Sequence, residues 1–375
     1  MSAIKKFLKI FVVLLMRARC IIGRLKNLPS SYRKYVRDSI TYYPELEHKS
    51  KLRLWCDYAV WYLRTGDVGL FFRAYGFDIK GRKPDPTVYL DENFFWHKII
   101  DLAYRGQGNY AVVLRDKNIF DMYMRMYDIP TPPVIAYTNA SGCYIKGKKV
   151  TLSEWVKYLV DHYSEFFFKG AMSCCGRDVV HVIVKDGQMV SDGKNFEITD
   201  SMVEGQNVVV QTPIKNCKEI AAINPYAVST IRMVTVMGAK SKEPELLCPG
   251  YMRIGCKKDS AVDNLCAGGV GVGLTSEGKL MPYGLFKPWI GEMKCYKHPL
   301  SGVVFDGYSI PFYEEACSLV KRAHRVLPTI PTIGWDVAIT ENGPTLIEGN
   351  DNWEISGVQI PHGGVKKRLM ELLES

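Results

Sequence analysis

The spacing of apolar residues predicts helices in the first third of the chain. Apolar side chains recur three or four positions apart from residue 51 onward, at Leu52, Trp55, Ala59 and Tyr62. This is the spacing of one face of a helix. A Thr-Gly-Asp sequence at 65–67 interrupts it, and a second apolar segment covers residues 68–77. We therefore expect a mostly helical region over residues 41–130, ending where the prolines of 129–133 impose extended backbone.

Beyond these prolines the pattern changes to short runs of β-branched and aromatic residues between glycine turns, which is typical of strands. The runs occupy residues 179–185, 207–212, 230–237 and 279–286. Two stretches among them, 152–163 and 312–326, have helical spacing instead. Helices mixed with short hairpin strands predict an α+β fold.

The pattern divides the chain into four segments. We expect an N-terminal arm over residues 1–40, the helical region over 41–130, a smaller α+β subdomain over 131–212 and a larger one over 213–375. Hydrophobic residues make up 47% of the chain and charged residues 23%. This composition excludes disorder of the whole chain, because it can supply a buried core.

The positive charge of the chain is confined to the N-terminal arm. The formal net charge is +10, but residues 1–40 carry ten Lys or Arg residues against one acidic residue, Asp38. The rest of the chain is almost neutral. Because a nucleic-acid groove needs a broad basic surface, we expect no nucleic-acid partner.

The arm combines this charge with an apolar run. Residues 10–16 form an uninterrupted apolar stretch of seven residues, far short of the roughly 20 that a membrane-spanning helix needs. The basic residues at 17–19 stand where a secretory signal has small residues for cleavage. We expect a basic amphipathic helix on an anionic membrane surface, where each basic residue contributes about 1 kcal/mol. The alternative is an ordinary helix packed on the body.

The eleven cysteines indicate free thiols. Their number is odd, none belongs to a C-x-x-C pair, and Cys174 and Cys175 are adjacent. A secreted fold of this size would normally pair its cysteines. We therefore expect a cytoplasmic protein, and the arm adds the inner face of the cell membrane as a location.

The densest polar signal within an apolar context lies near the C-terminal end. Two β runs, 334–340 and 344–350, carry Asp336, Glu348 and Asn350. Two carboxylates and an amide oxygen are the hard ligands that Mg²⁺ accepts beside water and phosphate oxygens. A merely solvated strand face would instead carry scattered Lys, Thr and Ser. We therefore predict a magnesium site on this hairpin.

The register of the hairpin decides whether these side chains meet. If the loop has three residues, with Gly343 in the left-handed conformation, Thr340 pairs with Pro344. Asp336 then lies opposite Glu348, with the asparagine on the same face. A two-residue loop would shift the register by one and place the carboxylates on opposite faces.

A second polar segment suggests a phosphate site. Lys169 ends an apolar run, and the loop after it contains Ser173 and Gly176. An ammonium group and several backbone N–H groups can surround a polyphosphate there, although an ordinary hairpin loop has the same composition. Residues 273–279 have the spacing of a P-loop, but Leu280 replaces the metal-binding Ser or Thr, so we expect a turn.

The order of the polar residues along the chain carries a family resemblance. They are Lys117, Lys169 with its Gly/Ser loop, Arg232, Asn264, Asp336, Glu348 and Asn350. With the proline segment 129–132 and the segments 229–235, 298–302 and 334–350, this order resembles the ATP-grasp superfamily. Within it, the chain is similar to the sugar-transfer-associated ATP-grasp proteins, which are related to α-L-glutamate ligases. The similarity covers about residues 90–365.

This resemblance implies a nucleotide, ATP, gripped between two α+β subdomains. The residues that it assigns to ATP are Lys117, Lys169, Ser173, Gly176, Gln211, Thr212, Ile214 and Asn264. Residues 211–214 would lie along the adenine, and the loop 173–176 would close over the phosphates. Arg232 and Lys169 would act on the transferring phosphate. The three hairpin residues would hold two Mg²⁺ ions.

The sequence also departs from the common family pattern. Gln211 stands where many relatives carry Glu, and Cys174 and Cys175 make the phosphate loop less rich in glycine. Lys287 and His298 precede prolines; each is either a turn residue or a contact to the acceptor substrate.

The resemblance implies an ATP-dependent carboxylate–amine ligase that works through an acyl-phosphate. Its substrates would be small or glycan-linked carboxylates and amines in surface polysaccharide or cell-envelope assembly. Two alternatives remain: a kinase that phosphorylates a sugar or lipid-linked glycan hydroxyl, and a non-catalytic scaffold in glycan assembly.

Overall fold

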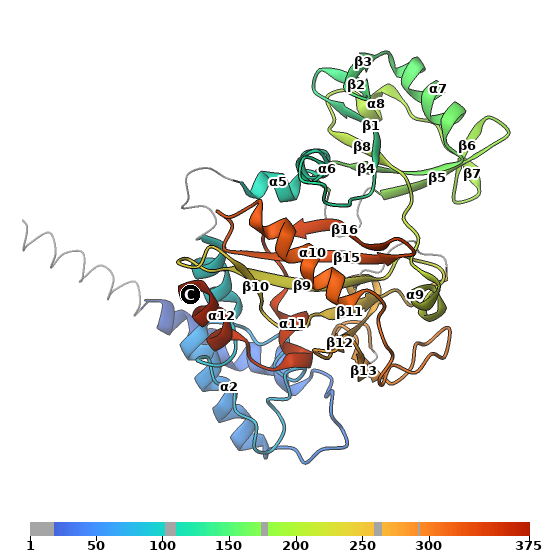
Figure 1. Cartoon of the computed structure of the whole chain (residues 1–375). Coiled ribbons are helices and arrows are strands. Elements are labelled where there is room, and N and C mark those ends of the chain that lie inside the picture. The colour runs from blue at the N-terminus through green and yellow to red at the C-terminus, as the bar shows by residue number, and fades with distance from the viewer. Residues whose placement is uncertain (1–18, 102–109, 174–178, 259–264, 292) are drawn as a thin grey trace, which may run out of the picture.

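The protein has two lobes, each built on one antiparallel β-sheet (Figure 1). The computed structural model describes residues 19–101, 110–173, 179–258, 265–291 and 293–375. In Figure 1 helix α2 (Lys51–Thr65) lies below the larger lobe, helices α5 (Ala111–Arg115) and α6 (Lys117–Arg125) lie on its upper side, and the smaller lobe projects above it. This is the α+β fold, with a helical N-terminal region, that the sequence pattern predicts.

The smaller lobe holds a sheet of eight strands within the described residues, in the order β3-β2-β1-β8-β4-β5-β6-β7. The strands are β1 (Val134–Asn139), β2 (Gly142–Ile145), β3 (Lys148–Val150), β4 (Glu165–Gly170), β5 (Val179–Lys185), β6 (Gln188–Ser191), β7 (Lys194–Asn195) and β8 (Val208–Gln211). Helix α7 (Leu152–His162) packs on this sheet through Trp155 and Leu159, and the short α8 (Asp200–Val203) precedes β8. Thr151 and Glu154 form a capping box that fixes where α7 begins.

The larger lobe holds the second sheet, also of eight strands in the described part of the chain. Seven run in the order β14-β13-β12-β11-β9-β15-β16, and β10 pairs with β9. The strands are β9 (Thr230–Met237), β10 (Pro244–Leu246), β11 (Tyr251–Ile254), β12 (Val270–Leu274), β13 (Leu280–Leu285), β14 (Lys294–Cys295), β15 (Thr332–Thr340) and β16 (Gly343–Asn350). Every residue of β9 is buried, because helices cover both faces of the sheet.

These helices belong to two hydrophobic cores. The helical elements of the larger lobe are α9 (Lys218–Ile223), η3 (Leu265–Ala267), α10 (Tyr313–Arg325), α11 (Ile355–His362) and α12 (Lys366–Glu374). α10 packs against β9, β15 and β16, in a core with Ile231 and Trp335. α11 and α12 pack on strands of the same sheet in a second core that includes Val234 and Trp353. Residues of β9 enter both cores, so this strand is the centre of the lobe.

The N-terminal region contains the predicted helix, but its buried face is centred on other residues than the predicted stripe. The helical elements are η1 (Arg33–Arg37), α2 (Lys51–Thr65), α3 (Glu92–Phe94), η2 (Phe95–Ile100), α5 (Ala111–Arg115) and α6 (Lys117–Arg125). In α2 the predicted stripe was wrong at Leu52, which is 74% exposed, whereas Tyr62 is buried and Trp55 and Ala59 are partly buried. Leu54, Tyr58 and Trp61 are buried instead, against a cluster that includes Phe72. The aromatic rings bury more apolar area than Leu52 would.

In the C-terminal hairpin of β15 and β16, Asp336 lies opposite Glu348 as predicted, but a β-bulge and not a three-residue loop produces this pairing. Thr340 pairs with Gly343, so the predicted pairing of Thr340 with Pro344 was wrong. A β-bulge beyond Val337 adds one residue to β16 and brings Asp336 opposite Glu348. Gly343 has a φ of 100°, in the left-handed region, as expected for the turn.

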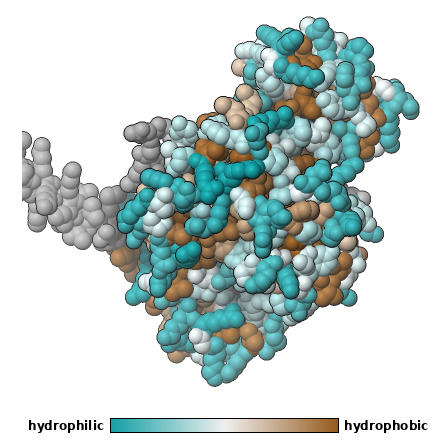
Figure 2. Space-filling view, in the orientation of Figure 1, coloured by the Kyte–Doolittle hydropathy of each residue, from teal (hydrophilic) through white to brown (hydrophobic). Residues whose placement is uncertain are grey.

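The structure also agrees with the turn predicted for residues 273–279. The segment with P-loop spacing is a turn between β12 and β13, closed by a hydrogen bond from the Thr275 N–H to the Lys279 carbonyl. Six cysteines of the described residues, at positions 20, 56, 143, 217, 248 and 317, have free thiols. Within the described residues, every helix is too short or too polar to cross a bilayer. Polar side chains cover most of the face seen in Figure 2, with apolar patches scattered between them.

Candidate functional site

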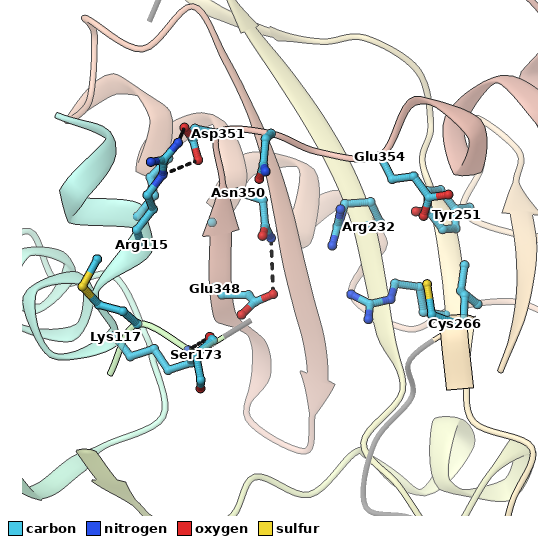
Figure 3. Close-up of a pocket in the computed structure, with 16 residues that line it drawn as sticks. Arg115, Lys117, Ser173, Arg232, Tyr251, Cys266, Glu348, Asn350, Asp351 and Glu354 are labelled. Carbon is cyan, nitrogen blue, oxygen red and sulfur yellow. Dashed lines mark hydrogen bonds and ion pairs between the residues drawn. The ribbon is translucent and has the colours of Figure 1, made fainter. Parts of the chain in front are cut away.

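A cleft of about 390 Å³ lies where the larger sheet meets helices α5 and α6 and the loop after β4 (Figure 3). Its charged and polar lining residues include Arg115, Lys117, Ser173, Arg232, Arg253, Glu348, Asn350, Asp351 and Glu354. In Figure 3, Lys117 and Ser173 lie at one end of the cleft and Glu354 at the other. The cleft thus collects cations and oxygen-bearing side chains from elements far apart in the chain.

The floor of the cleft is one row of the larger sheet. Glu348 on β16 pairs with Asp336 on β15, Asp336 pairs with Arg232 on β9, and Arg232 pairs with Tyr251 on β11. Residues that are direct partners in an antiparallel sheet point to the same face. The register therefore places two carboxylates, Glu348 and Asp336, and one guanidinium group, Arg232, side by side on three adjacent strands.

Asp336 is held between two arginines beneath the cleft. Its carboxylate accepts hydrogen bonds from Arg232 Nε at 2.5 Å and Nη2 at 3.0 Å, and from Arg253 Nη1 at 2.6 Å. Burial alone raises the pKa of Asp336, but the two guanidinium groups reverse this and hold the pKa well below its usual range. Asp336 is therefore fully ionised and fixes the position of both arginines.

Glu348 has the opposite electrostatic environment. Burial, the Asp336 charge and a hydrogen bond with the Asp336 carboxyl raise the pKa of Glu348 above its ordinary value. Asn350 Nδ2 donates to Glu348 Oε1 at 3.3 Å and to the Gly334 carbonyl at 3.4 Å. A cation placed at Glu348 would relieve the repulsion between the two carboxyl groups.

The oxygen donors of this hairpin fit Mg²⁺ in kind. Glu348 and Asn350 line the cleft, whereas Asp336 lies behind them in its ion pairs with arginine. Among the described residues, no group of three Asp, Glu, His or Cys side chains is placed to hold a metal ion on its own. A magnesium ion here would therefore take further ligands from water and phosphate, as Mg²⁺ usually does.

Lys117 is placed by the cap of helix α6. The Asp116 side chain accepts hydrogen bonds from the backbone N–H groups of Asn118 and Ile119 at 2.9 and 3.1 Å, so the helix begins at Lys117. The Lys117 ammonium donates to the carbonyl of Ser173 in the loop after β4. This contact joins the phosphate loop predicted from the sequence to a second predicted lysine.

Lys169 lies close to the same end of the cleft. Burial and the neighbouring charge of Lys117 lower its pKa to about 8, while Glu348 acts in the opposite direction. Its ammonium lies 5.5 Å from the centre of the Phe167 ring, on the same face of β4. Two amines and a carboxyl from the predicted set thus affect one another electrostatically.

The predicted adenine segment borders a second hollow of about 370 Å³. Ile214 and Phe167 line it. Gln211 is buried, and its Nε2 donates to the Pro132 carbonyl at 3.2 Å, while the Thr212 N–H donates to the Pro133 carbonyl at 3.2 Å. Phe167, which lines this hollow, also lies beside Lys169.

Of the remaining predicted residues, Lys287 and His298 are not among those that line the cleft. Lys287 is buried and contacts Glu354, which lines the cleft. His298 is fully buried, with its ring nitrogens near the Gly255 carbonyl at 2.9 Å and Ser301 Oγ at 3.1 Å, and it lines neither hollow. Gly176 and Asn264 fall outside the residues that the structure describes.

Sequence reasoning missed four charged residues of the cleft, which are Arg115, Arg253, Asp351 and Glu354. Arg253 is the second arginine on Asp336, and Arg115 forms an ion pair with Asp351 in which Nη2 and Oδ2 are 2.6 Å apart. Asp351 directly follows Asn350, so its position beside the predicted motif was an available signal. The arginines gave none, because their partners are 83 and 236 residues away.

The two sheets and the cation-rich cleft between them define a protein of the ATP-grasp fold. Residues 102–374 match the sequence model of the family described as sugar-transfer associated ATP-grasp. The chain therefore belongs to the sugar-transfer associated ATP-grasp family.

Solved structures with a similar arrangement are distant in sequence. An ADP complex of the N5-carboxyaminoimidazole ribonucleotide synthetase purK is 8% identical, with a TM-score of 0.42 over 71% of this chain and 53% of that one. The D-alanyl-alanine synthetase A from Vibrio cholerae is 14% identical, with a TM-score of 0.38 over 70% and 62%. The chain spans about half the length of the first of these proteins. No curated protein sequence matches it.

Proposed function

We propose that the chain is an ATP-dependent ligase that joins a carboxylate to an amine. The observation that supports this most directly is the composition of the cleft. Lys117, Arg232 and Glu348 line it, and the charges of Lys117 and Glu348 act on the buried Lys169. Cations that converge beside a magnesium-type donor set suit the binding of a triphosphate.

The proposed reaction has two steps. The substrate carboxylate attacks the γ-phosphorus of ATP, the bond to the β-phosphate oxygen breaks, and an acyl-phosphate and ADP form. The amine then attacks the acyl carbon, loses a proton and releases phosphate, which leaves an amide. Both steps concentrate negative charge on phosphate oxygens, so positioned cations lower their barriers.

The residues of the cleft have separate tasks in this scheme. Lys117 and Lys169 bind the phosphates, and the hollow at Ile214 accepts the adenine. Arg232 holds the transferred phosphate, and Asp336 keeps the arginine in place through two hydrogen bonds. Glu348 and Asn350 would hold Mg²⁺, which neutralises phosphate charge when bound.

The setting of the reaction is also part of the proposal. The family description refers to sugar transfer, so we assign the amide to surface polysaccharide or cell-envelope glycan assembly on the cytoplasmic side. The basic N-terminal arm would keep the enzyme at the anionic membrane surface, near a lipid-linked precursor.

Isotope transfer tests the chemistry. A candidate carboxylate labelled with ¹⁸O is incubated with the protein, MgATP and an amine, and the released phosphate is analysed by mass spectrometry. We expect one ¹⁸O atom in phosphate for each amide formed. Formation of ADP with a stable phosphorylated sugar, and no amide, would instead identify a kinase. Failure to bind MgATP in calorimetry would identify a scaffold.

A further inference from the structure

Next to the cleft lies a smaller, mainly apolar cavity of about 130 Å³. Its walls come from β12, β13 and α11, and they include Met281, Leu285 and Ile360. The only charged residue among its lining residues in the described chain is Lys287, which is 5% exposed. None of the residues assigned to the proposed reaction lines this cavity.

One of the glycines that line the cavity leaves room for a small side chain. Three glycines line it, at positions 271, 273 and 357. A Cβ atom on Gly273 would lie 2.5 Å from Pro361, and one on Gly357 would lie 2.3 Å from the Tyr251 ring, so neighbouring side chains occupy these spaces. A Cβ atom on Gly271 would meet nothing closer than Leu265 at 3.4 Å. A small side chain therefore fits at 271, although the chain has none there.

Such a hollow weakens the fold. Gly271 lies in the interior of β12 and has no positive φ that would require glycine. In a strand, glycine lowers stability and a β-branched residue raises it. An apolar void also loses dispersion contacts along its whole surface. Because the hollow lowers the stability of the fold, we expect that a ligand fills it.

The cavity and the cleft belong to the same face of the sheet. Arg253 on β11 pairs with Gly271 on β12, and Gly271 pairs with Leu285 on β13. Partner residues point to one face, and adjacent strands lie about 4.8 Å apart. Tyr251 and Leu265 line both spaces. A molecule that contacts the cleft near Arg253 is thus one strand away from the hollow.

A polar pair lies at the junction between the two spaces. Lys287 lines the cavity and contacts Glu354, which lines the cleft. Figure 3 shows Glu354, Tyr251 and Cys266 together at the end of the cleft opposite Lys117. The phosphate-binding lysines and the apolar cavity therefore lie at opposite ends, which is the separation that a nucleotide and a second substrate need.

We infer that this cavity binds the apolar substituent of the carboxylate substrate, whose carboxylate group lies in the cleft beside Arg253. The substrate class is a small carboxylic acid with a branched alkyl or aryl group, such as an apolar amino acid. The inference rests on the proposed ligase function and assigns the amine to the other substrate. An apolar cavity of about 150 Å³ holds benzene, so 130 Å³ suits a group of about four to six carbons.

A binding experiment tests the cavity without relying on catalysis. The dissociation constants of acetate, propanoate and 4-methylpentanoate are measured by ligand-observed NMR on the full chain. Each buried methylene contributes about fourfold, so we expect 4-methylpentanoate to bind at least about 50-fold more tightly than acetate. Gly271→Val fills the hollow and should remove most of this preference, and Gly271→Ala should reduce it by about fourfold.

Gly23→Ala is the matched control, because a Cβ atom there meets nothing within 4 Å and the site is remote in sequence from the cavity. It should leave the preference unchanged. Thermal unfolding checks that both Gly271 variants are folded, and Gly271→Ala keeps the test valid if valine disturbs the strand. Equal binding of acetate and 4-methylpentanoate, or a preference that survives Gly271→Val, would overturn the inference.

A second measurement separates this inference from the proposed function. The same acids are incubated with MgATP and hydroxylamine, which displaces phosphate from an acyl-phosphate and gives a hydroxamate. Hydroxamate that forms in the order of chain length, and loses that order in Gly271→Val, supports both proposals. Hydroxamate without any size preference would reject the cavity but keep the ligase. A size preference in binding, with no hydroxamate or ADP from any acid, would keep the cavity but reject the ligase.

Discussion

Glu348 is the cleft residue whose charge depends most on what is bound. Burial and Asp336 raise its pKa in the protein alone, whereas a bound cation would favour the ionised form. Glu348→Gln keeps the size of the side chain and removes a charge that Asp336 repels. We therefore expect less than about 3 °C change in melting temperature and a loss of at least about 100-fold in ADP release.

Glu315→Gln on the exposed surface of α10 is the control for this variant and should leave both values unchanged. Calorimetric unfolding and a coupled ADP assay measure the two effects. Retention of full ADP release in Glu348→Gln would contradict the assignment of Glu348 to magnesium.

Lys169 gives a prediction for the dependence on pH. Its lowered pKa of about 8 means that the ammonium form, which binds phosphate, is present below pH 8 and disappears as the pH rises. The pH profile of kcat/KM reports the ionisation of the free enzyme. We expect kcat/KM for ATP to fall about tenfold per pH unit above 8.

Lys169→Arg should abolish this fall, because a guanidinium group keeps its charge over the whole range. Initial rates between pH 7 and about 9.5, with ATP varied, measure the profile. Lys185→Arg at the exposed end of β5 should retain the profile of the unmodified protein. An unchanged fall in Lys169→Arg would mean that another group titrates.

At the residue scale, short motifs could be found in the sequence and distant partners could not. Glu348 and Asn350 stand two positions apart on one strand, and the structure brings them together. Arg253 lies in a four-residue strand, and its role depends on the pairing of β11 with β9. His298 illustrates the converse, because its polar ring satisfies a buried carbonyl instead of facing the cleft.

Among the secondary structure elements, the hairpin turn of β15 and β16 has the clearest energetic test. Gly343 has a φ of 100°, and a Cβ atom there would meet nothing within 4 Å. Gly343→Ala therefore introduces backbone strain without a steric clash, which costs about 1 to 2 kcal/mol. We expect a lower urea midpoint with an unchanged m value.

Gly343→Asn should cost less than alanine, because asparagine tolerates the left-handed region. Gly23→Ala should not lower stability, since helix interiors favour alanine over glycine. Equal stability of Gly343→Ala and the unmodified protein would show that the turn can adopt another conformation.

Alternation and spacing predicted the bounds of an element well where these bounds depend only on the residues of that element. The run at 179–185 is β5 and the run at 230–237 is β9, residue for residue. The bulge in β16 could not be predicted, because Ile347 is an ordinary strand residue and the extra position appears only when two strands are paired. The burial predicted for Leu52 in α2 was also wrong, since the buried face depends on which segment packs against the helix.

At the scale of the whole molecule, the cleft depends on contacts between the lobes that no local pattern encodes. The Lys117 N–H donates to the Ala171 carbonyl, and the Leu346 N–H donates to the Pro130 carbonyl, both at 2.9 Å. The first bond ties α6 to the loop after β4, and the second ties the proline segment to β16. Together they bring the two predicted halves of the site within reach of each other.

The N-terminal arm is attached to the body and also has exposed apolar side chains. Residues 19–32 are helical. Arg24 donates to the Leu63 carbonyl at 2.8 Å, and Leu28 is buried against the body. Ile21, Ile22 and Leu25 are each about half exposed. The segment is therefore attached to the body on one side and presents apolar side chains to solvent on the other, while residues 1–18 lie outside the described residues.

This arrangement predicts electrostatic binding to anionic membranes. In sedimentation with vesicles of phosphatidylserine and phosphatidylcholine, we expect the full chain to bind and a chain without residues 1–27 to remain in solution. Ile22→Glu with Leu25→Glu, in the intact chain, should weaken binding at least about tenfold, since the apolar contact and the attraction to anionic lipid act together.

Leu52→Glu, at a leucine exposed outside the arm, is the matched control and should bind normally. High salt or pure phosphatidylcholine should abolish binding. Equal sedimentation of the full and shortened chains would leave the arm as an ordinary helix of the body.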